Sequence, residues 1–255
     1  MLLAVDVGNT QTHLGAFSEQ ELVGEWRFTT ARDHTADEIG AALRNLLALR
    51  DMTFADLDAS ITSSTVPQLA PAWATVAERY LGHSMAIVGP GVRIGMPIRI
   101  DNPREAGADR LVNSVAAYER VGSACVVVDF GTAITYDCVS DDGEYLGGII
   151  APGVEISMEA LTERAAKLPR IDLTAPRALI GKGTVDAIRS GIIYGFAAQV
   201  DGILERIRDE LGDETEAIAT GGLAQTVVPY CEGIDDVDPL LTLIGLRIIH
   251  ERNQR

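Results

Sequence analysis

Apolar and polar residues alternate in the first thirty positions as they do in β-strands, and the spacing then becomes that of amphipathic helices. The clearest helix is expected at 36–50, where the capping box Thr35-x-x-Glu38 precedes an apolar stripe. In chain order, the elements expected in the first half are strands at about 12–17 and 21–29, the helix at 36–50, the strand "ASITSS", a helix at 67–81 and the strand "MAIVG".

The second half predicts a similar order of elements. They are strands at about 132–139 and 144–150, a helix at 154–167, a long helix at 184–211, the strand "AIAT" and a final helix at 239–252. Three glycines, Gly191, Gly195 and Gly202, leave open that the long helix is broken. Two such units in tandem predict an α/β protein with two lobes, residues 1–118 and 119–255, and a ligand cleft between them.

The opening stretch "AVDVGNTQTHLG" is echoed by "VVVDFGTAITYDCVS" at 126–140. At one constant offset, the second stretch matches the first at three positions: Asp6 with Asp129, Gly8 with Gly131, and Thr12 with Thr135. Because self-similarity at a fixed offset indicates duplicated units, this repeat supports the division into two related lobes.

The Asp-x-Gly turns have two interpretations. Asp6 is either the last strand residue before an ordinary hairpin, or it holds a cation while the turn binds a phosphate with backbone amides and hydroxyls. The duplication and a third glycine turn, "ATGG" at 219–222, favour a magnesium–nucleotide site. The stretch "PRALIGKGT" is not a P-loop, because Gly183 separates Lys182 from Thr184.

The composition of the chain indicates which classes of partner it does not bind and in which cellular compartment we expect it. The 255 residues carry a net charge of −16, which argues against nucleic acid or an anionic membrane as a main partner. No apolar run is long enough for a membrane span, and we expect no signal peptide. The three cysteines show no C-x-x-C pair, so we expect core residues in a reducing cytoplasm.

Three further segments, "DNPREAGADRLVNS" (101–114), "GGIIAPG" (147–153) and "IGKGTVDAIRSG" (180–191), identify the family. With "DVGNT", "DFGTA" and "ATGG", the chain resembles the acetate and sugar kinase, Hsc70 and actin superfamily, whose lobes are actin-like (ribonuclease H-like). Within it, the sequence resembles the type III pantothenate kinases from Leu2 to about Glu251.

The resemblance implies ATP-dependent phosphorylation of pantothenate to 4′-phosphopantothenate, the first step of coenzyme A biosynthesis. It also implies Mg²⁺, a monovalent cation (K⁺ or NH₄⁺), and a cytoplasmic homodimer with active sites shared across the interface. Two alternatives stay open: another kinase or phosphohydrolase on the same fold, and a catalytically weak homologue that acts as a nucleotide-binding regulatory or accessory protein.

Residue roles follow from the same resemblance. The ATP and phosphate contacts are Asp6, Val7, Gly8, Asn9, Thr10, Gln11, Thr12, His13 and Thr132. The pantothenate contacts are Ile100, Gly107, Ala108, Asp109, Arg110 and Thr184, the last supplied by the other subunit. Asp109 is the expected general base, Asp129 holds the monovalent cation, and Asp6 lies toward Mg²⁺. The chain departs from the family at Ile100, where many members carry tyrosine, and at Gly183, where asparagine is common.

The residues around Asp109 support its role independently. Gly107 permits a tight chain path before the helical run "RLVNSVAAYERV", and the positive end of that helix favours an ionised carboxylate. A carboxylate placed there could instead be an ordinary helix cap followed by a solvent-facing arginine. Without the resemblance, this second interpretation is the simpler one.

Overall fold

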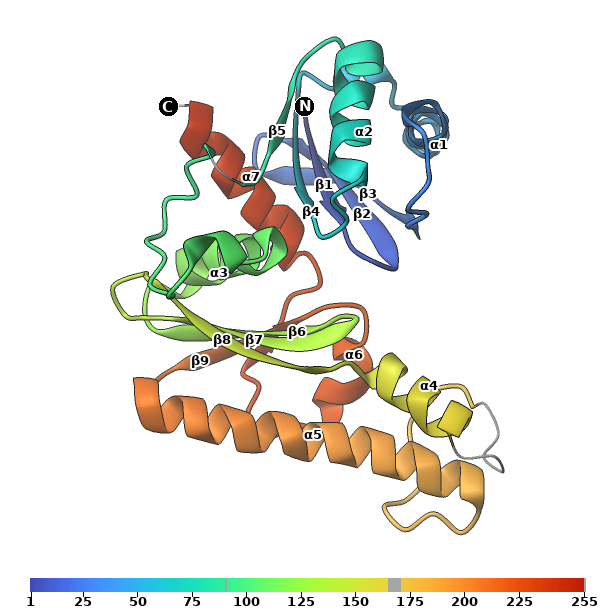
Figure 1. The fold of residues 1–255 in the computed structure, drawn as a ribbon, viewed down its shortest axis with the longest axis vertical. Coiled ribbons are helices and arrows are strands. Elements are labelled where there is room, and N and C mark those ends of the chain that lie inside the picture. Colours follow the sequence, from blue (N-terminus) through green and yellow to red (C-terminus); the bar gives the residue numbers. More distant parts are fainter. Residues whose placement is uncertain (90, 165–170, 255) are drawn as a thin grey trace. The chain divides into compact units, whose positions relative to one another are not determined.

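The computed structural model describes residues 1–89, 91–164 and 171–254, which form two compact units. Unit 1 contains Met1–Met96, Asp101–Ala116 and Leu240–Arg255, and unit 2 contains Pro97–Ile100 and Ala117–Pro239 (Figure 1). The units are therefore not contiguous in sequence. The C-terminal segment, which we expected in the second lobe, lies with the first sheet.

Unit 1 is built on a five-stranded sheet with the order β3-β2-β1-β4-β5. Its strands are β1 (Leu2–Val7), β2 (Gln11–Ser18), β3 (Glu21–Thr29), β4 (Ala59–Ser64) and β5 (Met85–Ile87). The first three form an antiparallel meander, whereas β4 is parallel to both β1 and β5. The carboxyl ends of β1 and β4 therefore lie at the same edge of the sheet.

Helices lie against this sheet (Figure 1). They are α1 (Ala36–Ala48), α2 (Leu69–Val76) with a π-helical turn at Ala77–Leu81, and α7 (Leu241–Gln254). Helix α3 (Ala108–Val121) packs on α7 and continues into unit 2. Short 3₁₀ turns occupy Phe54–Asp56 and Pro103–Glu105. The hydrophobic core beneath α1 and α2 takes alternate residues of the strands, Leu3, Val5 and Val7 among them.

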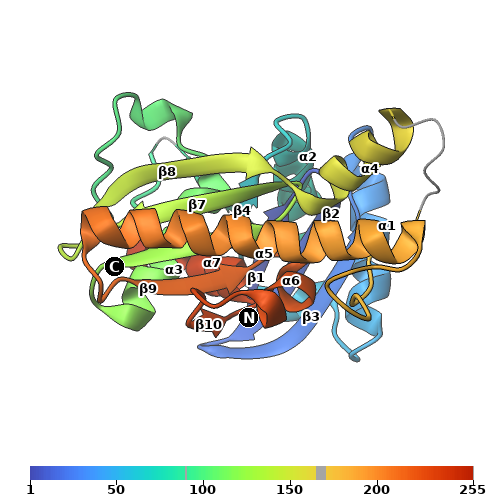
Figure 2. The ribbon, with the colours of Figure 1, turned by 90° about the horizontal axis from the view of Figure 1, so that it is seen from below.

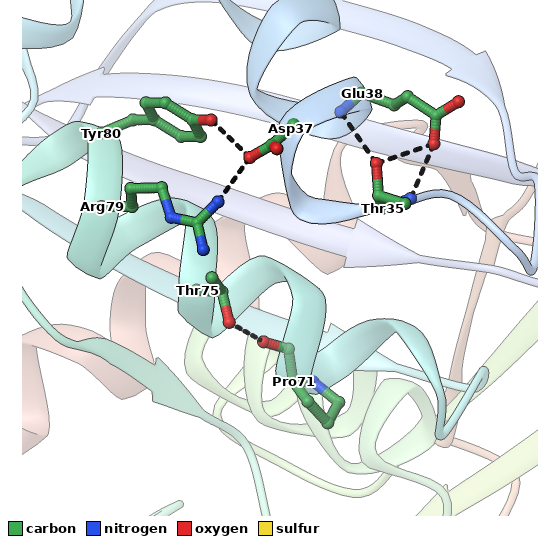
Figure 3. Close-up of polar contacts among 7 residues, drawn as sticks. All are labelled: Thr35, Asp37, Glu38, Pro71, Thr75, Arg79 and Tyr80. Carbon is green, nitrogen blue, oxygen red and sulfur yellow. Dashed lines mark hydrogen bonds and ion pairs between the residues drawn. The ribbon is translucent and has the colours of Figure 1, made fainter.

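Figure 3 shows that the capping box predicted for α1 is formed. The backbone N–H of Glu38 donates to Thr35 Oγ1 (3.3 Å), and the backbone N–H of Thr35 donates to Glu38 Oε2 (2.8 Å). One residue earlier, the carboxylate of Asp37 accepts from Arg79 (2.6 Å) and from the hydroxyl of Tyr80 (2.5 Å). These contacts join the start of α1 to the π-helical turn that follows α2.

Unit 2 repeats the sheet of unit 1, with the order β10-β9-β6-β7-β8. Its strands are β6 (Cys125–Phe130), β7 (Ala133–Val139), β8 (Tyr145–Pro152), β9 (Glu216–Thr220) and the short β10 (Asp236–Val237). Again three strands form an antiparallel meander and the first of them pairs in parallel with the fourth. The duplication predicted from the sequence is therefore confirmed at the level of topology.

The helices of unit 2 are α4 (Val154–Arg164), α5 (Thr184–Leu211) and the short α6 (Ala224–Val227), followed by a 3₁₀ turn at Val228–Tyr230. Figure 2 shows α5 running along the sheet. It is one 28-residue helix that the three glycines do not break, because a buried stripe including Ile192, Phe196 and Val200 packs on the sheet. The last residues of the helix predicted at 154–167 lie outside the described residues.

The two Asp-x-Gly hairpins differ by one residue. In the first turn, the Gly8 N–H donates to Gln11 O, with two residues between them; in the second, the Gly131 N–H donates to Ala133 O, with only Thr132 between. The register therefore pairs Asp6 with His13 and Asp129 with Thr135. The match of Thr12 with Thr135 made from sequence is wrong by one position.

Hydropathy of the helices gives no sign of a bilayer span. In the part of the chain that the structure describes, none of the helices combines the length and the apolar character that crossing a membrane requires.

Candidate active site

Asp6 lies at the carboxyl end of β1, where the parallel strand β4 also ends. Its partner in the β1–β4 register is Ser63, whose buried hydroxyl donates to Asp6 Oδ1 at 2.8 Å. Both side chains lie on the sheet face opposite to the core under α1 and α2, because Leu3, Val5 and Val7 occupy the other face. The aspartate in the opening strand is thus partly buried and hydrogen-bonded.

The same row of the sheet continues through β2 and β3. Asp6 pairs with His13, and His13 pairs with Arg27, so the three residues are cross-strand neighbours on one face. Glu25 also points to this face and accepts from His13 Nε2 at 2.8 Å. Burial, together with the positive charge of Arg27, lowers the pKa of His13, while Glu25 opposes the shift.

The expected phosphate loop is the turn between β1 and β2. The backbone N–H of Gly8 donates to Gln11 O at 3.0 Å, and a Cβ on Gly8 would lie 2.9 Å from that oxygen. Asn9, Thr10 and Gln11 are exposed at the tip of the turn. Two other residues of the expected set have buried side chains: Val7 in the hydrophobic core, and Thr12 against the Thr30 hydroxyl at 2.9 Å. Only their backbone can face a ligand.

The Gly-Ala-Asp-Arg element begins α3. The first backbone bond of the helix runs from the Leu111 N–H to Gly107 O, so Ala108 and Asp109 lie in the first turn. The carboxylate of Asp109 folds back over Gly107, because a Cβ there would lie 2.6 Å from Asp109 Oδ1. Glycine at 107 is therefore needed for the position of this carboxylate. Further along the helix, Leu111, Val112, Val115 and Ala116 are buried.

Asp6 and Asp109 are electrostatic neighbours. Burial raises the pKa of Asp6 to about 7; the hydrogen bond from Ser63 and the charge of Arg27 lower it, and the charge of Asp109 raises it further. The pKa of Asp109 is also raised by burial, against the lowering effect of the Arg110 backbone N–H. Two partly buried carboxylates that repel each other are a favourable environment for a cation.

The Asp6 carboxylate is a donor of the type that holds Mg²⁺. Among residues 1–89, 91–164 and 171–254, no three His, Cys, Asp or Glu side chains gather into a metal-binding cluster. Mg²⁺ at phosphoryl-transfer sites is held by one or two carboxylates, waters and substrate phosphates, so the single carboxylate of Asp6 is compatible with it.

Unit 2 presents a comparable turn. Asp129 lies at the carboxyl end of β6, one residue before its last, and pairs with Thr220 of the parallel strand β9, as Asp6 pairs with Ser63. Gly221, which follows Thr220 in the chain, has φ +94°, and a Cβ on it would lie 2.4 Å from Asp129 Oδ1. The glycine of "ATGG" thus gives room to the Asp129 carboxylate.

Thr132 is exposed at the tip of the second turn, which is supported by the "GGIIAPG" segment. A Cβ on Gly153 would lie 2.1 Å from the carbonyl oxygen of Thr132. The backbone of the β8–α4 junction therefore touches the turn directly, and the two motifs form one local structure.

The remaining predicted contacts, Thr184 and Ile100, also lie in unit 2. Thr184 is exposed at the start of α5, on the rim of a hollow of about 560 Å³ whose other lining residues are Leu161, Ala187, Ile188, Gly191 and Ile192. Ile100 packs on β8, 3.1 Å from where a Cβ of Gly147 would lie. Its side chain carries no hydrogen-bonding group.

Sequence reasoning missed Ser63, Glu25 and Arg27. Nothing in the run "ASITSS" singles out Ser63, because its contact with Asp6 depends on the pairing of two strands far apart in sequence. The position of Arg27 depends on the β2–β3 register in the same way.

Comparison with known proteins places this site in a family. A sequence model described as type III pantothenate kinase matches residues 2–206. The type III pantothenate kinase of Moorella thermoacetica is 51% identical over 253 residues, which cover 99% of this chain and all of the relative. The type III pantothenate kinase of Syntrophobacter fumaroxidans is 49% identical over 256 residues, which cover 100% of this chain and 99% of that relative.

Solved structures show the same fold at low identity. Component A of the (R)-2-hydroxyglutaryl-CoA dehydratase of Acidaminococcus fermentans has a TM-score of 0.59 at 14% identity, over 100% of this chain and 99% of its own. The ROK hexokinase of Thermus thermophilus has a TM-score of 0.50 at 14% identity, and the match covers 100% of this chain and 99% of the hexokinase chain. The α/β fold with two actin-like lobes is therefore confirmed.

Proposed function

Because the chain belongs to the type III pantothenate kinase family, which phosphorylates pantothenate in coenzyme A biosynthesis, we propose that Asp109 is the general base of this reaction. The observation that carries the proposal is the carboxylate of Asp109, folded over Gly107 at the start of α3 and beside Asp6. A primary hydroxyl must lose a proton as the phosphoryl bond forms, and a carboxylate within about 3 Å can accept it.

The environment of Asp109 suits this task. Partial burial raises its pKa and therefore its basicity, while the Arg110 backbone N–H and the start of α3 keep it ionised. Arg110, the next residue, is the proposed partner of the pantothenate carboxylate. If Asp109 were only a helix cap, nothing would require its carboxylate to lie beside Asp6.

The remaining roles concern charge compensation, which dominates phosphoryl transfer. Asp6, oriented by Ser63, would hold Mg²⁺ on the ATP phosphates, and Mg²⁺ would neutralise their developing charge. The turn from Gly8 to Gln11 and Thr132 would bind ATP with backbone and hydroxyl groups. Asp129, next to Gly221, would hold the monovalent cation.

We also propose a cytoplasmic homodimer in which Thr184 of one subunit completes the pantothenate site of the other. Supporting this, unit 2 exposes large apolar side chains at Ile150 (65%), Leu179 (64%) and Ile180 (82%). A hollow lined by Thr184 and apolar residues of α4 and α5 belongs to the same unit. The three cysteines are unpaired, as expected of a reducing compartment.

The alternative is a regulatory or accessory protein. The family model and the similar sequences are described as kinases, and a pure binding protein would not need the Asp109 carboxylate beside Asp6.

The test is ADP release by the purified protein with ATP, Mg²⁺ and K⁺, with and without pantothenate. We expect release to depend on pantothenate, with 4′-phosphopantothenate identified by mass. A parallel assay in Na⁺ at equal ionic strength should lose most activity if Asp129 holds K⁺. Tight ATP binding without pantothenate-dependent turnover would contradict the proposal.

A further inference from the structure

The phosphate loop of unit 1 lacks a cation of its own. Its exposed tip consists of the neutral residues Asn9, Thr10 and Gln11, and the chain as a whole carries a net charge of −16. ATP brings roughly four further negative charges, of which one Mg²⁺ neutralises two. A basic side chain at the loop would reduce the remaining repulsion.

Arg32 provides such a side chain. Its Nη2 donates to Asn9 Oδ1 at 3.3 Å, although the two residues belong to different connections of the sheet. Asn9 lies in the β1–β2 turn and Arg32 follows β3, in the segment that leads to α1. The guanidinium therefore reaches the tip of the phosphate loop.

Two further contacts fix this segment on the loop. The backbone N–H of Thr30 donates to Thr10 O at 2.9 Å. The buried hydroxyls of Thr12 and Thr30 are hydrogen-bonded at 2.9 Å. With Thr30 held at both its backbone and its side chain, Arg32 is two residues from an anchored position.

The charge of Arg32 is also not neutralised by a neighbouring acid. Three other arginines of unit 1 form ion pairs: Arg27 with Glu25, Arg79 with Asp37, and Arg247 with Glu251. Across the described ranges, the one hydrogen bond of Arg32 is that to the neutral amide of Asn9, and it makes no ion pair. A guanidinium has five N–H donors in a planar fork, so most of them stay free to bind an anion.

We propose that Arg32 binds the polyphosphate of ATP, with Asn9 holding its guanidinium over the loop. Arg32 is then a specificity residue for the nucleoside triphosphate in the active site proposed above, on which this inference rests. The contact is a charge-assisted hydrogen bond to phosphate oxygens, for which an arginine fork is well suited. It supplies a positive charge in addition to the metal ion.

The test compares Arg32→Gln and Arg32→Lys with Arg44→Gln, which removes an exposed arginine from α1. Calorimetry in Mg²⁺ buffer would measure binding of ATP, ADP and adenosine. We expect Arg32→Gln to weaken ATP binding about tenfold, as a charge-assisted hydrogen bond warrants, with adenosine changed less than about twofold. Arg32→Lys should give an intermediate loss, and Arg44→Gln no loss.

Equal losses for ATP and adenosine would overturn the inference, because they would indicate a distorted site instead of a lost phosphate contact. A change in ATP binding no larger than that of Arg44→Gln would overturn it as well. Since binding is measured without pantothenate, these results are independent of turnover. A protein that binds ATP through Arg32 but does not phosphorylate pantothenate would contradict the proposed function alone.

Discussion

Asp6 illustrates how a carboxylate with a proposed functional role lowers the stability of the fold around it. It is partly buried, its carboxylate accepts a hydrogen bond from Ser63, and the charge of Asp109 repels it. The pKa of about 7 means that ionising Asp6 in the folded chain costs free energy that the unfolded chain, with a pKa near 3.8, does not pay. This free-energy cost arises at the carboxylate that we propose as the ligand of Mg²⁺.

Replacing Asp6 by Asn should therefore stabilise unit 1 at pH 8 in EDTA while abolishing activity. A raised folded-state pKa gives wild type a contribution that is present at low pH and lost as pH rises through about 7. The advantage of Asp6→Asn should thus shrink by about 3 kcal/mol between pH 8 and pH 5.

Urea unfolding followed by tryptophan fluorescence measures this, because Trp26 and Trp73 are the two tryptophans of the chain and both are buried in the core of unit 1. A variant less stable than wild type at pH 8 would show that the Asp6 carboxylate is not destabilising. Added Mg²⁺ at pH 8 should stabilise wild type more than the variant.

Asp109→Asn keeps the shape of the side chain and removes its basicity. A positioned general base contributes typically about 10²–10⁴-fold, so kcat should fall at least about a hundredfold while ATP binding is retained. The matched control is Asp101→Asn, an exposed carboxylate in the segment before α3. A loss below about tenfold would reduce Asp109 to a structural residue of the helix start.

Helices α3 and α7 approach each other closely at one point. A Cβ on Gly245, in the second turn of α7, would lie 2.2 Å from the backbone oxygen of Val112 on α3. Close by, Thr242 Oγ1 donates to the buried Asn113 Oδ1 at 2.7 Å. Because α7 also packs on β1, β2 and β4, it connects the helix that carries Asp109 to the sheet that carries Asp6.

Gly245→Ala should therefore destabilise unit 1 by about 1–3 kcal/mol, since the added methyl group overpacks a backbone contact. It should lower kcat as well, because α3 must shift. The matched control is Gly195→Ala in α5, where a Cβ meets open space and helix propensity predicts a gain of about 0.5–1 kcal/mol. Circular dichroism melts of both variants give the comparison, and equal effects would contradict the packing argument.

Taken as a whole, the molecule consists of two units with one topology and different surfaces. Unit 1 carries Asp6 and Asp109, whereas unit 2 carries Thr184 and the exposed apolar side chains around α4 and α5. A dimer that shares its active sites would give these apolar side chains a partner.

Mixing Asp109→Asn with Thr184→Arg tests this arrangement, because each homodimer should be inactive. In a mixed dimer with sites shared between subunits, one site carries both defects and the other carries neither. Activity should return to roughly a quarter of wild type when equal amounts mix at random. If verified heterodimers stay inactive, Thr184 acts within its own chain.

The sequence alone determined the order of elements, the duplication and the family. Those properties depend on local information: the apolar period of each strand and helix, the capping box of Thr35 and Glu38, and short motifs around Asp6, Asp109 and Asp129. The apolar stripe of α5 predicts one continuous helix, as observed, although its glycines had left a break in the helix open.

Only the tertiary structure decided which distant residues meet. The pairing of β1 with β4 brings Ser63 to Asp6, the β2–β3 register places Arg27 beside His13, and the anchoring of Thr30 brings Arg32 to Asn9. The sequence also did not reveal that α7, at the end of the chain, belongs to the unit of the first sheet. A one-residue change in strand register turns a side chain to the other face, and no local pattern in the sequence fixes the partner of an antiparallel or parallel strand.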